Sequence, residues 1–242
     1  MTRALFLQDA YMRSAQAQVL GHTPEGGVIL DDSIFYATGG GQPGDSGTLA
    51  WSGNTLKIAT CVKVDGSPEA HTALVPAEPA SLPPVGSTVT QNLDWERRHS
   101  HMRVHTALHL LSVVIPLPVS GGSISAGKGR LDFDMPDAPE DKEALDRSLN
   151  ALIELDYVVS ESWISDDELR ANPHLVKTMS VQPPTGAGQV RLVRIGDVTR
   201  QIDLQPCGGT HVARTSEIGR VRIGKIEKKG KQNRRVYLHL DV

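Results

Sequence analysis

Short apolar runs separated by glycine and proline characterise the first part of the chain. They occupy residues 26–31, 33–36, 47–51 and 56–64. Several short β-prone segments divided by turn residues are typical of a small β-barrel or sandwich. Residues 76–84 are rich in proline, which predicts a stiff, ordered connection near a domain boundary.

A longer apolar repeat predicts a helix over residues 95–115. Its apolar positions recur at intervals of four, three and four residues, at Val104, Leu108, Leu111 and Ile115. This spacing places one buried stripe along a helix. His105 and His109 lie about a quarter to a third of a turn around from the stripe. The core is therefore expected to clamp the helix that carries them.

Two further helices are expected in the second half of the chain. Asp137 and Pro139, before an acidic first turn, predict the start of one helix. Its expected buried face consists of Leu145, Leu149, Leu152 and Ile153. A capping box at residues 165–168 predicts a short third helix.

Strand patterns complete the second half. They are expected at residues 190–195 and 198–203, and in a hairpin over residues 221–240. Strands and helices in this order indicate an α+β domain, with helices packed on a mostly antiparallel sheet. We therefore expect two domains: a β-barrel over residues 1–88 and an α+β domain over residues 89–242.

Two pairs of metal-ligand residue types stand far apart in the sequence. His105 and His109 are four residues apart, so on a helix their imidazoles share one face. Cys207 and His211 are separated by a Gly-Gly-Thr segment that suits a tight loop. Three nitrogens and one sulfur form a tetrahedral set that zinc prefers and magnesium or calcium does not. A shared Zn²⁺ site is expected.

The four-ligand set leaves the role of the metal open. A catalytic zinc normally keeps one open position. Either one ligand is displaced, with Cys207 or His211 the first suspects, or the ion becomes five-coordinate, or it only organises the site. Thr106 stands where the zincin motif HExxH has its glutamate base, so the helix is not that of a metalloprotease.

Composition narrows the setting of the protein. At 242 residues with 39% apolar residues the chain can bury a core in one large or two modest domains. Apolar runs are too short to cross a bilayer, and the first residues turn acidic too soon for a secretory signal, so no membrane association and a cytoplasmic location are expected. A zinc-bound thiolate needs a reducing compartment, and Cys61 is interpreted as a small buried apolar residue.

The net charge of −3 conceals a basic C-terminal end. Residues 212–242 contain nine lysine and arginine residues against three acidic ones. A solvated turn and a contact with a phosphate backbone are both consistent with this cluster. The candidates for tRNA contact are Lys225, Lys228, Lys229, Lys231, Arg234 and Arg235, with Arg97, Arg98 and Arg103 as further candidates.

Residues 38–47 form a glycine-rich segment that lacks the spacing of a P-loop. Glycines let backbone amides approach a ligand closely, although an ordinary turn is an alternative. Gln42 is a candidate to orient a water or a substrate carbonyl.

Three motifs together indicate a family: FYATGGGQPGD at residues 35–45, HTALHLL at 105–111 and CGGTH at 207–211. The chain resembles the AlaX family of freestanding alanyl-tRNA editing proteins, which are similar to the editing domain of alanyl-tRNA synthetase. The motifs occur in family order over nearly the whole length, and the glycine-rich N-terminal part is typical of the medium-length class. Ala37 departs from the proline that medium-length members often have.

The resemblance implies an EF-Tu domain II-like barrel followed by the editing domain shared with threonyl-tRNA synthetase. It also implies hydrolysis of the ester between tRNA specific for alanine and a wrongly attached amino acid, chiefly serine, with glycine as a second candidate. By motif position, His105, His109, Cys207 and His211 are the zinc ligands. Thr38, Gln42 and Thr106 are candidates for the catalytic pocket.

Two other functions stay open from the sequence. The first is an RNA-binding module in which zinc only stabilises the fold and no hydrolysis occurs. The second is a small-molecule zinc hydrolase, whose activity would depend little on salt, unlike that of a protein that contacts phosphates.

Overall fold

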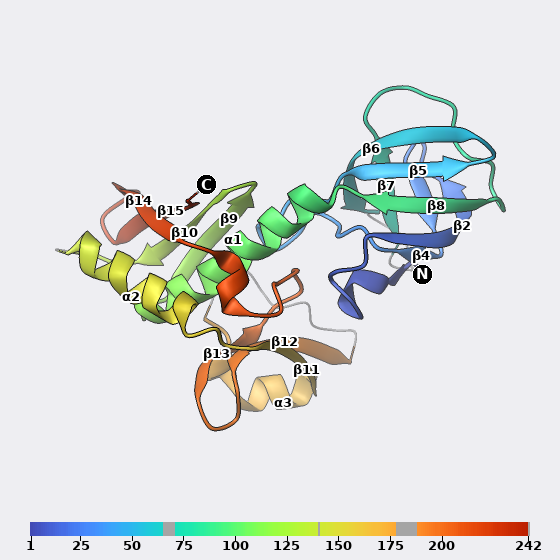
Figure 1. The fold of residues 1–242 in the computed structure, drawn as a ribbon. Coiled ribbons are helices and arrows are strands. Elements are labelled where there is room, and N and C mark those ends of the chain that lie inside the picture. The colour runs from blue at the N-terminus through green and yellow to red at the C-terminus, as the bar shows by residue number, and fades with distance from the viewer. Residues whose placement is uncertain (65–70, 140, 178–187, 242) are drawn as a thin grey trace. The chain divides into compact units, whose positions relative to one another are not determined.

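The computed structural model describes residues 1–64, 71–139, 141–177 and 188–241, which fall into two units, Met1–His99 and Ser100–Val242 (Figure 1). The predicted division between residues 88 and 89 stays a prediction. No helix in these ranges combines the length and the apolar character needed to cross a membrane.

The first unit is built around a closed antiparallel barrel with the strand order β2-β3-β7-β6-β5-β8. The strands are β2 (Ser14–His22), β3 (Val28–Leu30), β5 (Gly47–Trp51), β6 (Asn54–Lys63), β7 (Thr72–Pro76) and β8 (Thr88–Leu93). A short parallel pair, β1 (Arg3–Ala4) and β4 (Asp32–Ser33), stands apart from the barrel sheet, and η1 (Leu5–Leu7) follows β1. The predicted barrel is confirmed.

Some barrel strands carry too little apolar alternation to be predicted. The buried positions of β2 are Ala17 and Val19, and its other residues are mostly small or polar. In a closed barrel small inward residues suffice, because the opposite wall fills the interior. The core cluster includes Val19, Leu30, Phe35 and Leu49.

The expected strand over residues 33–36 is wrong beyond Ser33. Ile34 and Phe35 are fully buried but irregular. Their backbone N–H groups donate to side chains in place of a neighbouring strand: Ile34 to Gln91 Oε1 at 3.1 Å and Phe35 to Ser33 Oγ at 3.2 Å. Side-chain acceptors thus satisfy buried amides that a ladder would otherwise pair.

The second unit contains two antiparallel sheets. One has the order β14-β15-β10-β9 and the other the order β11-β12-β13. The strands of the first are β9 (Val119–Ser125), β10 (Lys128–Asp134), β14 (Val221–Lys228) and β15 (Asn233–Leu240). Those of the second are β11 (Val159–Ser165), β12 (Gln189–Gly196) and β13 (Gln201–Pro206). Helices beside antiparallel sheets confirm the α+β class.

Helix α1 (Trp95–Val114) matches the predicted helix, and all four residues of its predicted stripe are buried. It packs on β10 at Gly129, where an added Cβ would lie 2.7 Å from Val104 Cγ1 and 3.0 Å from Leu108 Cδ1. Glycine is required there because the helix approaches the strand so closely. This contact fixes the helix that carries His105 and His109.

Helix α2 (Lys142–Glu154) begins later than predicted. Asp141, not Asp137, is its N-cap and accepts a hydrogen bond from Ala144 N–H at 2.8 Å. Asn150 then joins the helix to β14 through both the N–H and the carbonyl of Val221. Several residues can cap an N-terminus, so the sequence placed the helix correctly but not its first turn.

The remaining expectations meet with mixed outcomes. The capping box of α3 (Asp166–Ala171) is confirmed, with Ser165 and Glu168 bonded reciprocally. Strand β13 lies later than predicted, because Val198, expected inside it, lies in the preceding turn and is 88% exposed. Two 3₁₀ turns, η2 (Pro173–Leu175) and η3 (Thr215–Ile218), complete the described elements.

Candidate metal centre

His105, His109, Cys207 and His211 meet in one cluster, in which one ligand atom from each lies within 4.8 Å of the others. Cys207 Sγ is 3.2 Å from His211 Nε2 and 3.5 Å from His105 Nε2. The three histidines are buried and Cys207 is partly buried. Side chains from segments about a hundred residues apart thus form a site that could hold a metal ion.

Two elements position these ligands. Consecutive helical turns of α1 place His105 and His109 together, with ring centroids 5.2 Å apart. Cys207 and His211 come from the loop that follows β13, and the His211 ring lies 4.2 Å from that of His105. The predicted helix and loop are both observed.

The loop is held from behind by Arg191 of β12. Arg191 is buried and its Nη1 donates to the carbonyls of Cys207 at 2.9 Å and Gly209 at 2.8 Å. Glu161 of β11 accepts from its Nε at 2.8 Å and also pairs with Nη2. A bidentate guanidinium restrains the loop, so its glycines do not leave Cys207 free to move.

The charge pattern prepares Cys207 to act as a ligand. Burial alone raises the pKa of its thiol, but the positive charges of His105 and His211 outweigh burial and hold the pKa well below its usual range. Gly209 N–H lies 3.5 Å from the sulfur and also favours the thiolate. Burial, helped by the charge of His105, lowers the pKa of His211 to about 3. A thiolate and a neutral imidazole are the forms that bind metals.

Hydrogen bonds outside the cluster fix two of the imidazoles. His109 Nδ1 lies 2.9 Å from Asp203 Oδ2, and His211 Nδ1 lies 3.1 Å from Thr106 Oγ1. When Nδ1 is engaged in this way, Nε2 is left for a metal. The cluster therefore has the donors and the orientation of a tetrahedral site.

Thr106 is fully buried on α1, and its hydroxyl is saturated by protein partners. It donates to Met102 O at 3.0 Å and accepts from His211 Nδ1 and, at 3.3 Å, from Val212 N–H. A threonine hydroxyl offers one donor and two acceptor positions, and all three are used. Thr106 thus contacts a cluster residue in this structure.

Thr38 and Gln42 lie in the first unit, whereas the cluster lies in the second. Gly40 and Gly41 have φ values of 55° and 83°, and the N–H of Gln42 donates to Gly39 O at 2.9 Å. The tip is thus a tight two-residue turn that favours glycine at both central positions. Gln42 itself is buried.

Thr38 anchors this turn to the barrel. Its hydroxyl donates to Cys61 O at 3.2 Å and accepts from Gly44 N–H at 2.9 Å. Gly44 has no room for a side chain, because a Cβ there would overlap the Cys61 carbonyl. The Thr38 hydroxyl keeps one acceptor position in addition to these two bonds. Cys61 is a free, buried thiol, as expected, and burial raises its pKa to about 12.

Arg98, considered for phosphate contact, is fully buried, so that interpretation is wrong. It forms an ion pair with Asp45 and donates to the carbonyls of Ala10 at 2.9 Å and Ile34 at 2.6 Å. Asp45 also accepts from Tyr36 N–H at 2.6 Å. The sequence shows a run of cations here but not that one of them has a carboxylate partner far along the chain.

The basic residues of the C-terminal hairpin divide into two groups. Arg234 is buried and donates to the carbonyls of Gly230, Asn233 and Pro136. Arg235 forms two 2.8 Å bonds with Asp132 of β10. Both arginines thus hold the hairpin in place.

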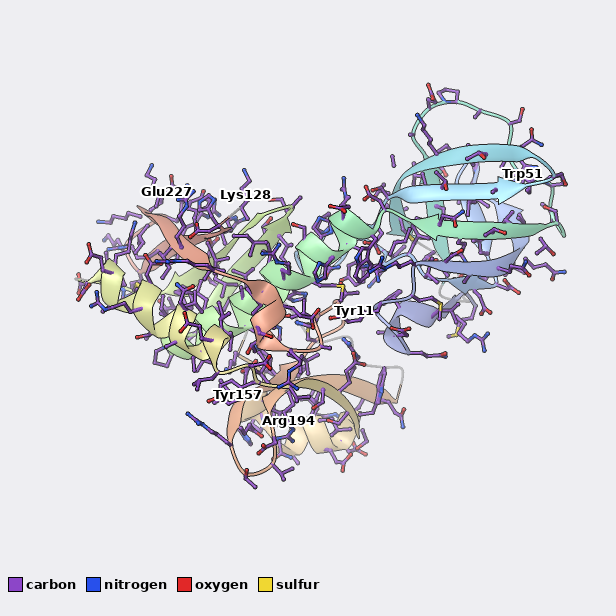
Figure 2. All side chains as sticks on the ribbon, viewed as in Figure 1. Tyr11, Trp51, Lys128, Tyr157, Arg194 and Glu227 are labelled. Atoms are coloured by element: carbon purple, nitrogen blue, oxygen red, sulfur yellow. The ribbon has the colours of Figure 1, made fainter. Side chains whose placement is uncertain are left out.

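The four candidate lysines of the hairpin are exposed: Lys225, Lys228, Lys229 and Lys231. Glu227, labelled in Figure 2, pairs with Lys225 at 2.9 Å and Lys229 at 3.0 Å, and these partners lower its pKa to about 2. Within the described residues, Lys228 and Lys231 take part in no ion pair. Their ammonium groups are the ones most available to a partner.

The sequence reasoning missed Arg191, Asp203 and Gln205 around the cluster. One signal was present: residues 203, 205 and 207 alternate along β13, so their side chains point to one face. Polar residues at alternate positions before a ligand cysteine can therefore indicate supporting groups.

Comparison with known proteins agrees with this geometry. Residues 190–237 match the model of the threonyl and alanyl tRNA synthetase second additional domain, and residues 5–97 match that of class II (A) tRNA synthetases. The alanyl-tRNA editing protein AlaX-M of Methanosarcina acetivorans is 32% identical over 247 residues, covering 99% of both chains. That of Methanosarcina barkeri is 33% identical, with the same coverage. The chain belongs to the AlaX-M family of alanyl-tRNA editing proteins.

Membership of the AlaX-M family confirms the resemblance indicated by the three motifs. The alanine–tRNA ligase of Pyrobaculum arsenaticum is also similar, with 35% identity over 236 residues, but the chain spans only 25% of that enzyme's length. The match to the second additional domain includes Cys207 and His211 and begins after α1, so the two ligands from the helix lie outside it.

Proposed function

We propose that this protein hydrolyses the ester bond between tRNA specific for alanine and a wrongly attached amino acid, chiefly serine, with glycine as a second substrate. The cluster of three histidines and one cysteine in a member of the AlaX-M family carries the proposal. The relatives are named as alanyl-tRNA editing proteins, and the proposal extends that activity to this chain.

Zn²⁺ is the proposed metal, held by His105, His109, Cys207 and His211. One thiolate and three imidazoles fit the tetrahedral geometry and the softness of zinc better than those of oxygen-preferring cations. When bound, zinc supplies Lewis-acid polarisation of the ester carbonyl or of a water. The restraints on His109, His211 and the Cys207 loop argue against easy loss of a ligand, which favours a five-coordinate or organising ion.

A second site is chemically necessary for accuracy. A pocket built for alanine cannot exclude the smaller glycine and rejects serine only weakly, because an added hydroxyl costs about a hundredfold at most in an apolar pocket. An editing pocket can instead favour the hydroxyl. We propose that Thr38 accepts the hydrogen bond of the serine hydroxyl with its remaining acceptor position, and that Gln42 lines the same pocket.

Thr38→Val and Thr38→Ser separate recognition from structure. The serine variant keeps the hydroxyl and its two loop bonds, whereas the valine variant removes them. The ratio of seryl to alanyl hydrolysis is expected to fall by roughly tenfold in Thr38→Val, on the scale of one hydrogen bond, and to hold in Thr38→Ser. Equal ratios in the wild type and both variants would remove Thr38 from the pocket.

For Thr106 we propose a positioning role in place of direct contact with the amino acid. Its three hydrogen-bonding positions are used by the protein, so a substrate group would have to displace a protein partner.

Contact with tRNA is proposed for the exposed lysines Lys225, Lys228, Lys229 and Lys231. Arg234 and Arg235, both candidates from the sequence, are proposed to keep the hairpin in the conformation that presents these lysines. Clustered ammonium groups on an exposed hairpin suit the phosphate backbone.

The test is the loss of ester from seryl-, glycyl- and alanyl-tRNA specific for alanine, with and without a chelator. Chelator-sensitive hydrolysis of seryl-tRNA, with alanyl-tRNA spared, is expected. A folded, metal-containing protein that binds tRNA but hydrolyses none of the three would indicate the RNA-binding module. Equal hydrolysis of a free seryl ester, with little salt dependence, would indicate a small-molecule hydrolase.

A further inference from the structure

A group of buried polar side chains lies directly behind His109. Asp203 of β13 is at its centre, with a side chain that is fully buried. Its Oδ2 is 2.9 Å from His109 Nδ1 and 2.8 Å from Gln205 Nε2, and its Oδ1 is 2.5 Å from Lys177 Nζ. Both carboxylate oxygens therefore accept hydrogen bonds, as a buried charge requires.

Strand register delivers these groups. Asp203 and Gln205 are buried in β13 while Leu204 between them is less so, and the alternation continues to Cys207. One face of one strand thus supplies two supporting groups and then a ligand. This arrangement fixes the distance between the ligand loop and the support for His109.

The protonation of Asp203 determines what it can do for His109. Burial alone raises the pKa of this carboxyl, but the hydrogen bond and charge of His109, together with Lys177, lower it to about 2. An ionised carboxylate only accepts hydrogen bonds. His109 Nδ1 must then carry a proton, and the lone pair available to a metal is on Nε2.

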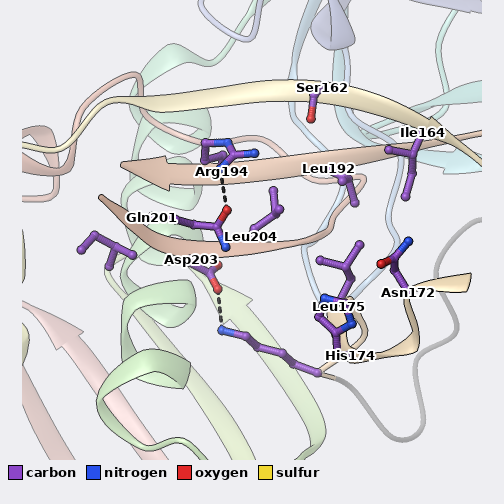
Figure 3. Close-up of a pocket in the computed structure, with 12 residues that line it drawn as sticks. Ser162, Ile164, Asn172, His174, Leu175, Leu192, Arg194, Gln201, Asp203 and Leu204 are labelled. Carbon is purple, nitrogen blue, oxygen red and sulfur yellow. Dashed lines mark hydrogen bonds and ion pairs between the residues drawn. The ribbon is translucent and has the colours of Figure 1, made fainter. Parts of the chain in front are cut away.

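Lys177 holds the other side of the carboxylate at the edge of a cavity. The cavity has a volume of about 610 Å³ and is lined by Asp203, Lys177 and Arg194 among others (Figure 3). The Lys177 side chain is 31% exposed, whereas Asp203 is not exposed at all. Because solvent reaches Lys177, its contribution should be smaller than that of the buried partners.

We propose that Asp203 is a positioning residue for the metal centre, which keeps His109 in the Nδ1–H form and is itself held by Gln205 and Lys177. This inference rests on the metal-binding part of the proposed function and is independent of the tRNA substrate. It adds an outer shell to the four ligands, and loss of such a partner typically lowers metal affinity by about 10- to 100-fold.

The expected order of effects follows from the donors that each variant leaves. Asp203→Ala removes the acceptor and should lower Zn²⁺ affinity by about 10- to 100-fold. Asp203→Asn can still accept from His109 if its amide nitrogen turns toward Lys177, which can swing into solvent, so its loss should be smaller. Lys177→Met should have the smallest effect.

A matched control is available on the other sheet. Asp132 of β10 is also a largely buried carboxylate held by an arginine, Arg235, but it has no contact with the cluster. Asp132→Asn should therefore leave Zn²⁺ affinity unchanged. Any reduction it causes measures the general effect of removing a carboxylate from this unit.

The experiment is a titration of metal-free protein with Zn²⁺ against a chromophoric chelator, without tRNA. The visible spectrum of the Co²⁺-substituted variants reports the ligand field, and ¹⁵N-edited NMR of the zinc-loaded wild type reports the His109 tautomer. Weaker binding and an altered Co²⁺ spectrum in Asp203→Ala, with a wild-type Asp132→Asn, are expected.

Wild-type affinity and spectrum in folded Asp203→Ala would overturn the proposal. So would a metal-bound Nδ1 of His109 in the wild type, a result that needs no variant to fold. Failure of tRNA hydrolysis with normal metal behaviour would count against the proposed function alone.

Discussion

Individual polar residues in this protein are committed to partners that lie far away in the sequence. The Thr106 hydroxyl bridges Met102, one turn earlier, and His211, across the cluster. Arg98 pairs with Asp45 inside the first unit. A side chain that looks available in the sequence can therefore be fully used in the fold, and its mutation tests structure before function.

Thr106→Val should weaken the metal site more than it changes substrate choice. The isosteric valine leaves His211 Nδ1–H and Val212 N–H without an acceptor, which costs about 1–3 kcal/mol for a buried donor. Denaturant unfolding and Zn²⁺ competition should both register the loss, whereas Thr106→Ser should restore most of it. Altered seryl to glycyl selectivity with unchanged metal affinity would instead place Thr106 in the amino-acid pocket.

Arg98→Met should destabilise the first unit and not act through RNA. Removing one member of a buried ion pair leaves an uncompensated charge and costs about 3–5 kcal/mol. The double variant Arg98→Met with Asp45→Asn should recover much of that stability in denaturant unfolding, because no buried charge is left unpaired. If the single variant kept wild-type stability but bound tRNA more weakly, Arg98 would be a phosphate contact after all.

Elements differ in how clearly the sequence announces them. Helix α1 has a strong periodic stripe, and the hairpin of β14 and β15 has apolar alternation on both sides of a polar turn. Strands β7 and β11 are short or largely polar, and they form because a neighbouring strand supplies the hydrogen bonds. The loop of residues 207–211 likewise depends on Arg191 from an adjacent strand.

Removing the unpaired lysines of the hairpin should weaken tRNA binding uniformly. Lys228→Ala with Lys231→Ala removes two exposed charges and should lower the slope of log affinity against log salt by about one for each phosphate that is no longer neutralised. Lys57→Ala, an exposed lysine of the barrel strand β6, is the control. Binding measured over a salt series checks this, and an unchanged slope in the double variant would place the tRNA interface elsewhere.

Across the protein as a whole, the cluster joins α1 to the segment that follows β13. A metal bound there adds stability that grows with its free concentration, about 4 kcal/mol at a thousandfold excess over its dissociation constant. This stabilisation should belong to the second unit, because all four ligands lie in it.

Chelation should therefore loosen the second unit selectively. Hydrogen exchange is expected to accelerate in residues 100–114 and 207–211, while the barrel strands, which contain no ligand, keep their protection. Refilling with Zn²⁺ should reverse the change. Equal loss of protection in the barrel, or none in either unit, would contradict a local organising role for the ion.

Local pattern and residue type were enough to establish the barrel, the ligand-bearing helix, the α+β class, the four cluster residues and the family. The use of the polar groups, in contrast, depends on the folded chain. Asp203, Arg191 and Thr106 support the cluster, and Arg98 and Arg234 are buried, through partners that only folding brings within hydrogen-bond distance. Periodicity is written along the chain, whereas the pairing of buried charges and hydroxyls is set by packing between distant segments.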